Sequence, residues 1–466
     1  MRSGLGRPLR GTRVHFVGIG GVGMAALAEL LHAMGYEVSG SDLKESEPVR
    51  RLEALGAKVH VGSHEPHHAD GAEHVIVSAA VSPTNPEVVR AREAGAEVIM
   101  RAELLGRIFD AGRGIAVAGT HGKTTTSSML AMILERAGMD PSFVIGGDLN
   151  DVGSGARLGA GDLVVAEADE AFSSFLHLRP ELAVVTNVDI DHLDHFGTPE
   201  AIDEAFLTFL DQRRPDGPAV LCVDDPGIAR LRERVRGPVV TYGTSDADLV
   251  VSRSEEGWWR LTWRGVDAGT LRLSVPGLHH VLDAAGAAAA AFLLGARPEE
   301  TVEALSAFTG VERRFSVRGV QGGVTVVDDY AHHPREIEAT LQAARERYAG
   351  SQIVALFQPH LYSRTRDLAE EFGKAFADAD VVVITDVYGA RETPIPGVSG
   401  RSIWDTVQHN FEGGQQIAIY APLLDEAAGL AAGMVSAGDV IVTLGAGDVT
   451  TAGPRILEML QLLEPG

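Results

Sequence analysis

The chain has 466 residues, of which 45% are hydrophobic and 22% charged, and its formal net charge is −24. This length predicts two to three domains. The negative charge argues against nucleic-acid binding, which needs a basic face, and no apolar run is long enough to predict membrane insertion. The single cysteine, Cys222, permits no disulfide within the chain and fits a cytoplasmic protein.

A glycine loop follows the first predicted strand. Residues 14–17 are typical of a strand, and the apolar stripe from Leu27 to Met34 predicts a helix that Gly35 ends. The intervening segment matches G-x-G-x-x-G, and an acidic residue stands at the end of the next strand. The loop predicts a bound anion, usually a pyrophosphate, and its candidate residues are Gly18, Gly20, Gly21, Gly23 and Asp42.

Further strands at 36–39 and 75–78 predict a doubly wound parallel sheet for residues 1–106. An NAD-dependent oxidoreductase is therefore one hypothesis, although a UDP-sugar carries a pyrophosphate too. Between these strands lie four histidines, whose spacing matches no zinc pattern and which we expect in a solvent-exposed loop: His60, His64, His67 and His68.

A second glycine loop follows the predicted strand at 115–118. It consists of Gly119, Thr120, His121, Gly122, Lys123, Thr124 and Thr125, and a helix ended by Gly138 follows. Backbone N–H groups at a helix start can hold phosphate oxygens, Lys123 can reach the terminal phosphates of ATP, and Thr124 can ligate Mg²⁺. The loop is shorter than the Walker pattern, which argues against GTPases and common P-loop kinases. Because hydride transfer needs no ATP, it also disfavours a simple dehydrogenase.

Acidic residues follow the next two predicted strands, at 163–166 and 182–186. Glu167 ends the first, and His192 lies beyond the second. Parallel strands place such residues at one sheet edge, so we expect both to face the triphosphate and to ligate Mg²⁺. Most of the other acidic residues here are expected to form a solvated rim: Asp169, Glu170, Asp189, Asp191 and Asp194.

Alternation at Trp259, Leu261 and Trp263, and again over 271–275, predicts antiparallel strands at one edge of a central domain, residues 107–316. Residues 317–466 predict a third α/β unit with buried strands at 324–327, 353–357, 381–385 and 440–444. Two strand ends there bring four side chains toward one crevice, where an arginine can clamp a carboxylate: Tyr330, His332, His360 and Arg364.

Together these motifs resemble the Mur ligases, the ATP-dependent amide-bond-forming enzymes of peptidoglycan precursor synthesis. The stretches GIGGVGMAALAELL, GTHGKTTT, VVAEADE, TNVDIDHLDHF, VERRF, DDYAHHP and FQPHLYSRTRDL carry the resemblance and run in family order. It implies an α/β protein of three domains. These are a Rossmann-like UDP-sugar domain (1–106), a central P-loop ATPase-type mixed-sheet domain that binds ATP (107–316) and a Rossmann-like amino-acid domain (317–466).

The resemblance further implies a ligase that joins L-alanine to the lactyl carboxylate of UDP-N-acetylmuramate through an acyl phosphate. Glu167 and His192 would hold Mg²⁺ beside Lys123 and Thr124, and Arg314 and Asp329 would reach the nucleotide. His279 and Asp283 lie where the family often reads G-x-H-N-x-x-N-A near the adenine, so both family asparagines are replaced here. Ser78 and Arg101 join the UDP-sugar residues, and the alanine pocket would consist of Tyr330, His360 and Arg364.

Other interpretations remain open. A recycling ligase would add a whole peptide to the same UDP-sugar, and a non-catalytic regulator would only bind nucleotide. Three candidates can accept the proton of the alanine amine: His192, His332 and bulk water. We expect small-molecule partners only, UDP-N-acetylmuramate, L-alanine and ATP, with no nucleic acid, and a monomer or a homodimer.

Overall fold

The computed structural model describes residues 5–149, 154–191, 193–390 and 392–463, and its strands form three sheets. The chain divides into two compact units. The first comprises the residues up to Leu273 together with Val281–Thr309, and the second comprises Ser274–His280 and the residues from Gly310 onward. The first unit holds two sheets and the second holds one, so the three-domain α/β architecture is confirmed. Within the described ranges, no helix is both long and apolar enough to cross a membrane.

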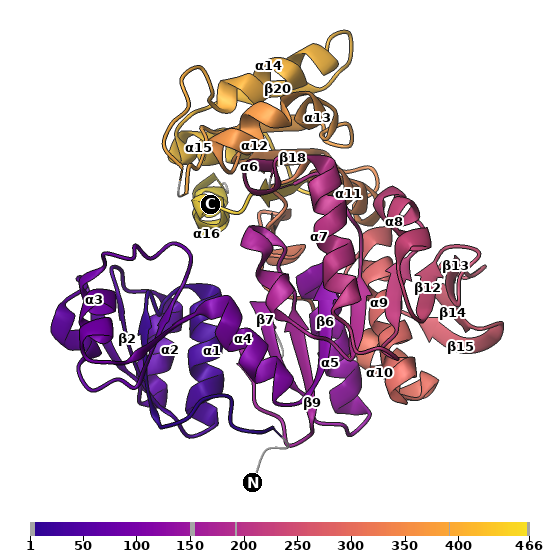
Figure 1. Ribbon diagram of the computed structural model, residues 1–466. Helices are drawn as coiled ribbons and strands as arrows, with labels where there is room; N and C mark the ends of the chain where they lie inside the picture. The colour runs from indigo at the N-terminus through magenta and orange to yellow at the C-terminus, as the bar shows by residue number, and fades with distance from the viewer. Residues whose placement is uncertain (1–4, 150–153, 192, 391, 464–466) are drawn as a thin grey trace. The chain divides into compact units, whose positions relative to one another are not determined.

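The N-terminal sheet is parallel, with strand order β3-β2-β1-β4-β5. This part of the chain is coloured indigo to purple in Figure 1. Apolar side chains cover both faces of the sheet, in two separate clusters. Burial on both faces is clearest in β4, where three apolar residues follow one another without alternation. Its elements are β1 (Arg13–Val17), α1 (Val22–Ala33), β2 (Glu37–Asp42), α2 (Glu47–Leu55), β3 (Lys58–Val61), η1 (Pro66–Ala69), β4 (His74–Val77), α3 (Pro86–Glu93), β5 (Glu97–Met100) and α4 (Arg101–Asp110).

The central sheet has ten strands in the order β15-β14-β13-β12-β11-β10-β6-β9-β7-β8. Strands β13 to β7 in this order are parallel, and β8, β14 and β15 are antiparallel to their neighbours. The mixed sheet that we predicted is therefore present. Its strands are β6 (Arg113–Ala118), β7 (Ser142–Leu149), β8 (Ser154–Arg157), β9 (Leu163–Glu167), β10 (Leu182–Val185), β11 (Ala219–Cys222), β12 (Val239–Gly243), β13 (Leu249–Arg253), β14 (Trp259–Trp263) and β15 (Val266–Leu271).

One predicted strand of this domain was misplaced. We expected alternation over 271–275 to form a strand, but β15 ends at Leu271. The reason is a two-residue turn between β14 and β15. Arg264 and Gly265 have φ values of 47° and 80°, so the chain reverses immediately and Val266 pairs with Trp263. Such turns with two positive φ values match the twist of a hairpin.

The helices of this domain begin where capping chemistry favours them. Thr198 and Asp225 accept hydrogen bonds from the backbone of the first turns of α7 and α8, and a proline follows each cap. These elements are α5 (Lys123–Arg136), η2 (Ala171–His177), α6 (Leu193–Phe196), α7 (Pro199–Asp211), α8 (Pro226–Leu231), η3 (Arg232–Arg234), α9 (Leu278–Leu294) and α10 (Pro298–Ala307).

The N-terminal and central domains share one apolar core. Helix α1 contacts β7 and β8, and the same buried cluster includes residues of both domains. Glu29 of α1 adds a polar contact between these two domains by accepting from Ser154 Oγ at 2.5 Å. It also accepts from Arg51 Nε, within the N-terminal domain, at 2.7 Å. The expected boundary at residue 106 lies inside α4.

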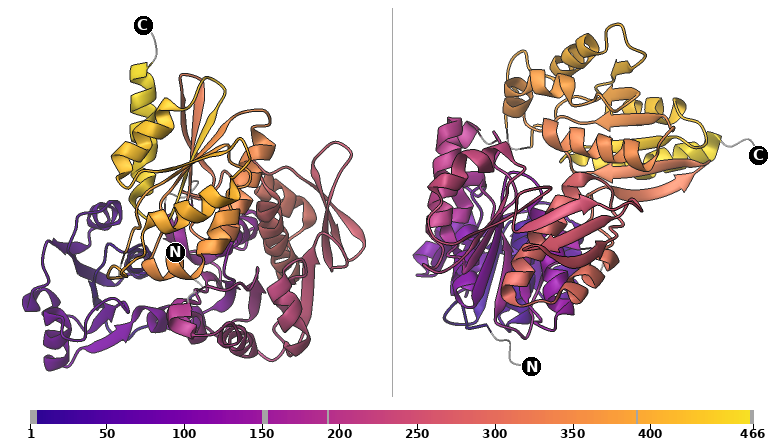
Figure 2. Two further views of the ribbon diagram at one scale, coloured as in Figure 1. Left: turned by 90° about the horizontal axis from the view of Figure 1, so that it is seen from above. Right: turned by 90° about the vertical axis from the view of Figure 1, so that its right-hand side faces the viewer.

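The third sheet has the order β16-β17-β21-β18-β19-β20, and only its β16–β17 pair is antiparallel. Helices lie on both faces (Figure 2), which makes two apolar clusters. Strands β16 and β20 carry half-exposed edge residues, and the sequence did not predict them. The elements are β16 (Ser316–Gln321), β17 (Val324–Asp329), α11 (Pro334–Arg347), β18 (Ile353–Phe357), α12 (Tyr362–Asp367), α13 (Ala369–Lys374), β19 (Val381–Ile384), α14 (Gly400–Asn410), β20 (Ile417–Tyr420), α15 (Leu424–Gly433), β21 (Val440–Leu444), η4 (Asp448–Thr451) and α16 (Ala452–Leu463).

The histidines of the N-terminal domain do not all lie in a solvent-exposed loop, so that prediction was wrong. Glu87 is fully buried at the start of α3 and accepts from His15 Nε2 at 3.2 Å and His68 Nδ1 at 2.9 Å. His64 Nδ1 lies 3.6 Å from the same carboxylate, and His60 stacks on His68. His15, the 60–68 segment and Glu87 come from three separate stretches of the sequence, which is why spacing alone did not reveal the cluster.

Ser41 completes this histidine–Glu87 cluster. Its hydroxyl donates to Glu87 at 2.7 Å, and its backbone carbonyl accepts from the N–H groups of Gly18 and Ile19. Burial alone would raise the pKa of Glu87, but the hydrogen bonds from His15, Ser41 and His68 outweigh burial and lower that pKa from 4.5 to about 2. The carboxylate is thus a charged anchor beneath the first glycine loop.

We expect Glu87→Gln to lower the free energy of unfolding at pH 7 by about 3 kcal/mol, the value equivalent to a pKa lowered from 4.5 to about 2. A carboxyl group with a lowered pKa stabilises the fold above its unfolded-state pKa and loses that contribution as the pH falls toward its folded-state pKa. The deficit should therefore shrink between about pH 4.5 and pH 2. Urea unfolding at several pH values measures it, and Glu93→Gln, on the exposed face of α3, is the control. A deficit independent of pH would contradict the assignment.

Candidate active site

The second glycine loop connects β6 to α5, as the sequence predicts. Strand β6 lies inside the central sheet between β10 and β9, so the loop stands at the carboxyl edge of that sheet. Gly119 and Gly122 have φ values of 136° and 79°, which side chains rarely adopt. A Cβ atom would collide with Thr186 Oγ1 at the first position and with Asp283 Oδ1 at the second. Both glycines are therefore required by conformation and by close packing.

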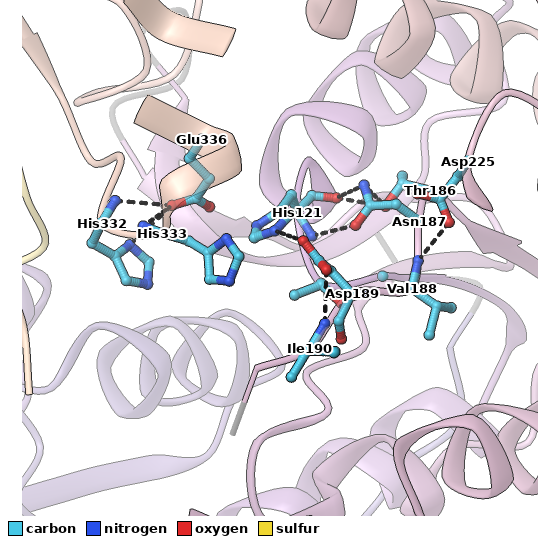
Figure 3. Close-up of polar contacts among 12 residues, drawn as sticks. His121, Thr186, Asn187, Val188, Asp189, Ile190, Asp225, His332, His333 and Glu336 are labelled. Carbon is cyan, nitrogen blue, oxygen red and sulfur yellow. Dashed lines mark hydrogen bonds and ion pairs between the residues drawn. The ribbon is translucent and has the colours of Figure 1, made fainter. Parts of the chain in front are cut away.

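The segment after β10 holds this loop in place (Figure 3). Asn187 accepts from the His121 N–H at 2.8 Å, and its side-chain amide donates to the His121 carbonyl at 3.0 Å. The Thr120 hydroxyl accepts from the Asp189 N–H at 2.9 Å, and His121 Nε2 lies 3.4 Å from Asp189 Oδ2. Asp189 thus supports the loop from a position that the sequence assigned to a solvated rim.

Helix α9 contributes Asp283 to the same loop. Its carboxylate is buried and accepts from the Thr126 hydroxyl at 3.1 Å, in the first turn of α5. A carboxylate near a helix N-terminus is favourable because the dipole is positive there. We predicted Asp283 as an adenine-binding residue, and the structure shows it packed against Gly122 of the second glycine loop.

Thr124 and Glu167 meet at the edge where the sequence predicts a metal. The Thr124 hydroxyl donates to Glu167 Oε2 at 3.0 Å, and the Gly146 N–H donates to the same oxygen at 2.7 Å. Hydroxyl and carboxylate oxygens are ligands that Mg²⁺ prefers, so this pair fits such an ion. His192, the third predicted ligand, lies outside the described residues.

Lys123 is bound to a carboxylate that the sequence placed in the solvated rim. Its ammonium lies 2.8 Å from Glu170 Oε2, and Glu170 is only 3% exposed, so the expectation of a solvated residue was wrong. Burial would lower the pKa of Lys123, but Glu170, Asp169 and Glu167 raise it, which keeps the ammonium charged. Burial raises the pKa of Glu170, and the adjacent Lys123 ammonium, which lowers it, favours the ionised carboxylate in this pair. Sequence spacing gives no signal for this pair, because the loop after β9 must fold back to form it.

The first glycine loop is bordered by the residues predicted for it. Asp42 accepts from the Gly20 N–H at 2.8 Å, and a Cβ atom on Gly23 would lie 2.7 Å from Nη1 of Arg101. Gly18 and Gly21 belong to the same turn between β1 and α1, and Ser78 follows β4 at the same sheet edge. Asp42 is already bonded to the loop, whereas the equivalent acid of a dinucleotide site binds a ribose hydroxyl.

The second unit assembles the predicted third-domain cluster. The ring centroids of Tyr330 and His332 lie 5.3 Å apart, and those of His332 and His360 lie 5.7 Å apart. Arg364 Nη1 lies 3.3 Å from His360 Nδ1, and the Arg364 side chain is buried. Tyr388, which the sequence did not suggest, stacks on His360 with centroids 5.9 Å apart. Tyr330, His332, His360 and Tyr388 come from the segments after the parallel strands β17, β18 and β19, and Arg364 comes from α12, which follows β18.

Asp329 and Arg314 lie beside this cluster. Asp329 accepts from the backbone N–H groups of Phe315 at 2.7 Å and Ala331 at 2.8 Å. Burial raises the pKa of Asp329 to about 6, while the Arg314 charge and these two hydrogen bonds lower it. The Arg314 guanidinium lies 5.1 Å from the centroid of Tyr330. Close by, Glu336 accepts from the N–H groups of His332 and His333 (Figure 3).

His279 and His280 lie at the start of α9, in the part of that helix that belongs to the second unit. Burial, with the nearby His280 and Arg314 charges, lowers the pKa of His279 well below its usual range. Burial also lowers the pKa of His280 to about 4, although its contact with the Pro276 carbonyl, at 2.6 Å, raises it. Both rings are therefore neutral near pH 7.

Comparison with known families accounts for this combination of sites. The model described as "Mur ligase family, catalytic domain" matches residues 13–113. The "Mur ligase middle domain" matches residues 117–291, and the "Mur ligase, glutamate ligase domain" matches residues 313–447. The chain belongs to the Mur ligase family.

Relatives within the Mur ligase family match nearly the whole chain. A UDP-N-acetylmuramate–L-alanine ligase from Kineococcus radiotolerans is 50% identical over 459 residues, which cover 96% of each chain. A protein of the same name from an Anaeromyxobacter species is 46% identical over 457 residues, 97% of this chain and 98% of the relative. The solved UDP-N-acetylmuramate-alanine ligase of Thermotoga maritima superimposes with a TM-score of 0.81 at 31% identity, covering 97% of this chain and all of that one.

We expect Gly122→Ala to weaken the binding of ADP at least tenfold, because the new methyl group meets Asp283 and the backbone favours glycine. Isothermal titration of the Mur ligase with ADP measures the change. Gly429→Ala in α15, where a Cβ atom meets open space, is the matched control. Wild-type affinity in Gly122→Ala would show that the loop tolerates the displacement.

Proposed function

We propose that this protein is an ATP-dependent ligase that joins L-alanine to the lactyl carboxylate of UDP-N-acetylmuramate. The observation that carries the proposal is identity of 45–50% over nearly the full chain to curated relatives of that name. The two separate glycine loops support it, because such a reaction uses a UDP-sugar and ATP. The first loop would take the pyrophosphate of the sugar nucleotide, and the second would take the triphosphate.

The chemistry proceeds by an acyl phosphate. A carboxylate oxygen of UDP-N-acetylmuramate attacks the γ-phosphorus, and ADP leaves. The alanine amine then attacks the acyl carbon, and inorganic phosphate leaves with the oxygen that it had gained. The N–H groups at the start of α5 and the Lys123 ammonium would hold the phosphates during the first step. Mg²⁺ held by Thr124 and Glu167 would supply further positive charge against the triphosphate.

The cluster around Arg364 would bind alanine. Its guanidinium can hold the amino-acid carboxylate by two parallel hydrogen bonds, and His360, Tyr330 and Tyr388 surround it. His332 is the candidate proton acceptor that the described residues place beside this pocket. Its Nδ1 lies 3.0 Å from the Tyr330 carbonyl, so Nδ1 carries the proton and Nε2 is the basic nitrogen.

The alternatives are less well supported. A murein peptide ligase from Psychrobacter arcticus shares the fold with a TM-score of 0.73, but its identity to this chain is 25%. An oxidoreductase would not need the second loop, and Asp42 is already bonded to Gly20. A regulator without catalysis would not require the buried polar cluster at Arg364. We further propose a cytoplasmic location, consistent with the single, buried thiol of Cys222, and a monomer or homodimer acting on small molecules.

The deciding experiment measures ADP release with each substrate omitted in turn. We expect release only when ATP, UDP-N-acetylmuramate and L-alanine are all present, and the product should be larger than the UDP-sugar by one alanyl residue in mass spectrometry. A tripeptide acceptor tests the recycling ligase, and absorbance of a nicotinamide cofactor tests the oxidoreductase. Preference for the tripeptide would refute the proposed amino-acid specificity.

We expect Arg364→Ala to raise the KM for L-alanine by about ten- to a hundredfold, because a charged hydrogen bond contributes about 1.5–3 kcal/mol. The KM for ATP should change little. Steady-state titrations of each substrate measure both values. Arg366→Ala is the matched control, because that side chain is 54% exposed and paired with Asp367. An unchanged alanine dependence would remove Arg364 from the pocket.

A further inference from the structure

We propose that Glu170 is a positioning residue that holds Lys123 while the nucleotide site is empty and gives it up to the phosphates when nucleotide binds. The inference rests on the proposed function only in requiring that the second loop binds a nucleotide. It assigns to Glu170 a role in the strength of nucleotide binding, which the ligase activity by itself does not specify.

The contacts of Lys123 carry the inference. Its ammonium donates to the Gly119 carbonyl at 2.6 Å, to the Thr120 carbonyl at 3.0 Å and to the two Glu170 oxygens at 2.8 and 3.1 Å. An ammonium has three N–H donors, and these contacts use all of them. A phosphate oxygen can therefore reach Lys123 only by replacing one of these partners.

Glu170 is the partner that a phosphate would replace. The two carbonyls belong to Gly119 and Thr120, in the same glycine loop as Lys123, and neither carries a net charge. Glu170 comes from a different segment, between β9 and η2, and carries the negative charge that a phosphate would also bring. Two negative groups at one buried ammonium repel each other, so the arrival of a phosphate favours the departure of the carboxylate.

The same segment also holds the neighbouring side chain of the loop. Glu167, three residues before Glu170, accepts from the Thr124 hydroxyl at 3.0 Å. Lys123 and Thr124, the two side chains predicted to bind the triphosphate and its metal, are thus each bonded to a carboxylate of the 167–170 segment. Glu167 and Glu170 thus provide hydrogen-bond partners for the two side chains that are proposed to bind the triphosphate and its metal.

The exchange has a cost and a benefit. Breaking a buried ion pair is unfavourable, so Glu170 weakens the binding of every nucleotide that uses Lys123. The same pair re-forms when the product leaves, which favours the release of ADP. Glu170 would therefore lower affinity and increase the rate of product dissociation.

The test uses the full-length protein and its affinities for ADP and AMP, measured by isothermal titration without the other substrates. We expect Glu170→Gln to bind ADP about tenfold more tightly, a change of about 1.4 kcal/mol, and to release it more slowly. AMP lacks the phosphates that Lys123 reaches, so its affinity should not change. Asp169→Asn is the matched control, because it removes a neighbouring charge but leaves the Lys123–Glu170 pair, and we expect a smaller effect.

Two further measurements separate this role from a structural one. The nucleotide-free Glu170→Gln protein should unfold at a lower temperature than the wild type, because the buried ammonium has lost its counter-charge, and ADP should stabilise it more. In a Lys123→Ala background, Glu170→Gln should leave the ADP affinity unchanged. If Glu170→Gln does not fold, Glu170→Asp, which withdraws the carboxylate by one methylene group, should show an intermediate gain in affinity.

Unchanged or weaker ADP binding by folded Glu170→Gln would overturn the inference. The carboxylate would then either have no effect on ADP affinity or stabilise the bound ADP. A tenfold gain that persists in the Lys123→Ala background would overturn it too. Absence of ADP binding to the wild type would refute the proposed function as well, whereas normal wild-type binding leaves that proposal intact.

Discussion

The structure depends on one constraint: the loop between β6 and α5 must be held in its conformation by neighbouring segments of the chain. Asn187 bonds to both the N–H and the carbonyl of His121, and Thr120 bonds to Asp189. Asp283 packs against Gly122 from a helix more than 150 residues away in sequence. Because a loop of this kind gains no regular ladder of hydrogen bonds, groups from two other parts of the chain, the segment after β10 and α9, provide its partners.

The electrostatics of the site follow from that arrangement. The chain carries a formal net charge of −24, so an anionic ligand meets an unfavourable overall field. The protein offsets it locally, through the start of α5 and the Lys123 ammonium. Acidic side chains surround the same loop, and three of them bond to side chains in the first turn of α5: Glu167, Glu170 and Asp283. The positive charge of Lys123 is therefore compensated by the protein's own carboxylates, and under the proposal above a nucleotide would replace one of them.

Much of this could be predicted from the sequence because the deciding signals are local. The β6–loop–α5 unit is contiguous, and parallel strands bring their carboxyl ends together, which explains why Thr124 lies beside Glu167 and why His332 lies beside His360. The histidine–Glu87 cluster and the Lys123–Glu170 pair depend on chain segments that fold back on each other, and no spacing rule describes that. The edge strands β16 and β20 were missed because their exposed residues weaken the apolar pattern. His192 lies outside the described residues, and its role stays a prediction.

The division of the chain has a mechanical consequence. The polypeptide passes between the two compact units three times, after Leu273, after His280 and after Thr309. The middle crossing lies inside α9, a continuous helix that carries His280 on one side and Asp283 on the other. A helix resists bending. A change in the direction of α9 at His280 would therefore be transmitted along the helix to Asp283, whose carboxylate lies against Gly122. A single proteolytic cut after Thr309 would leave only Ser274–His280 of the second unit joined covalently to the first unit.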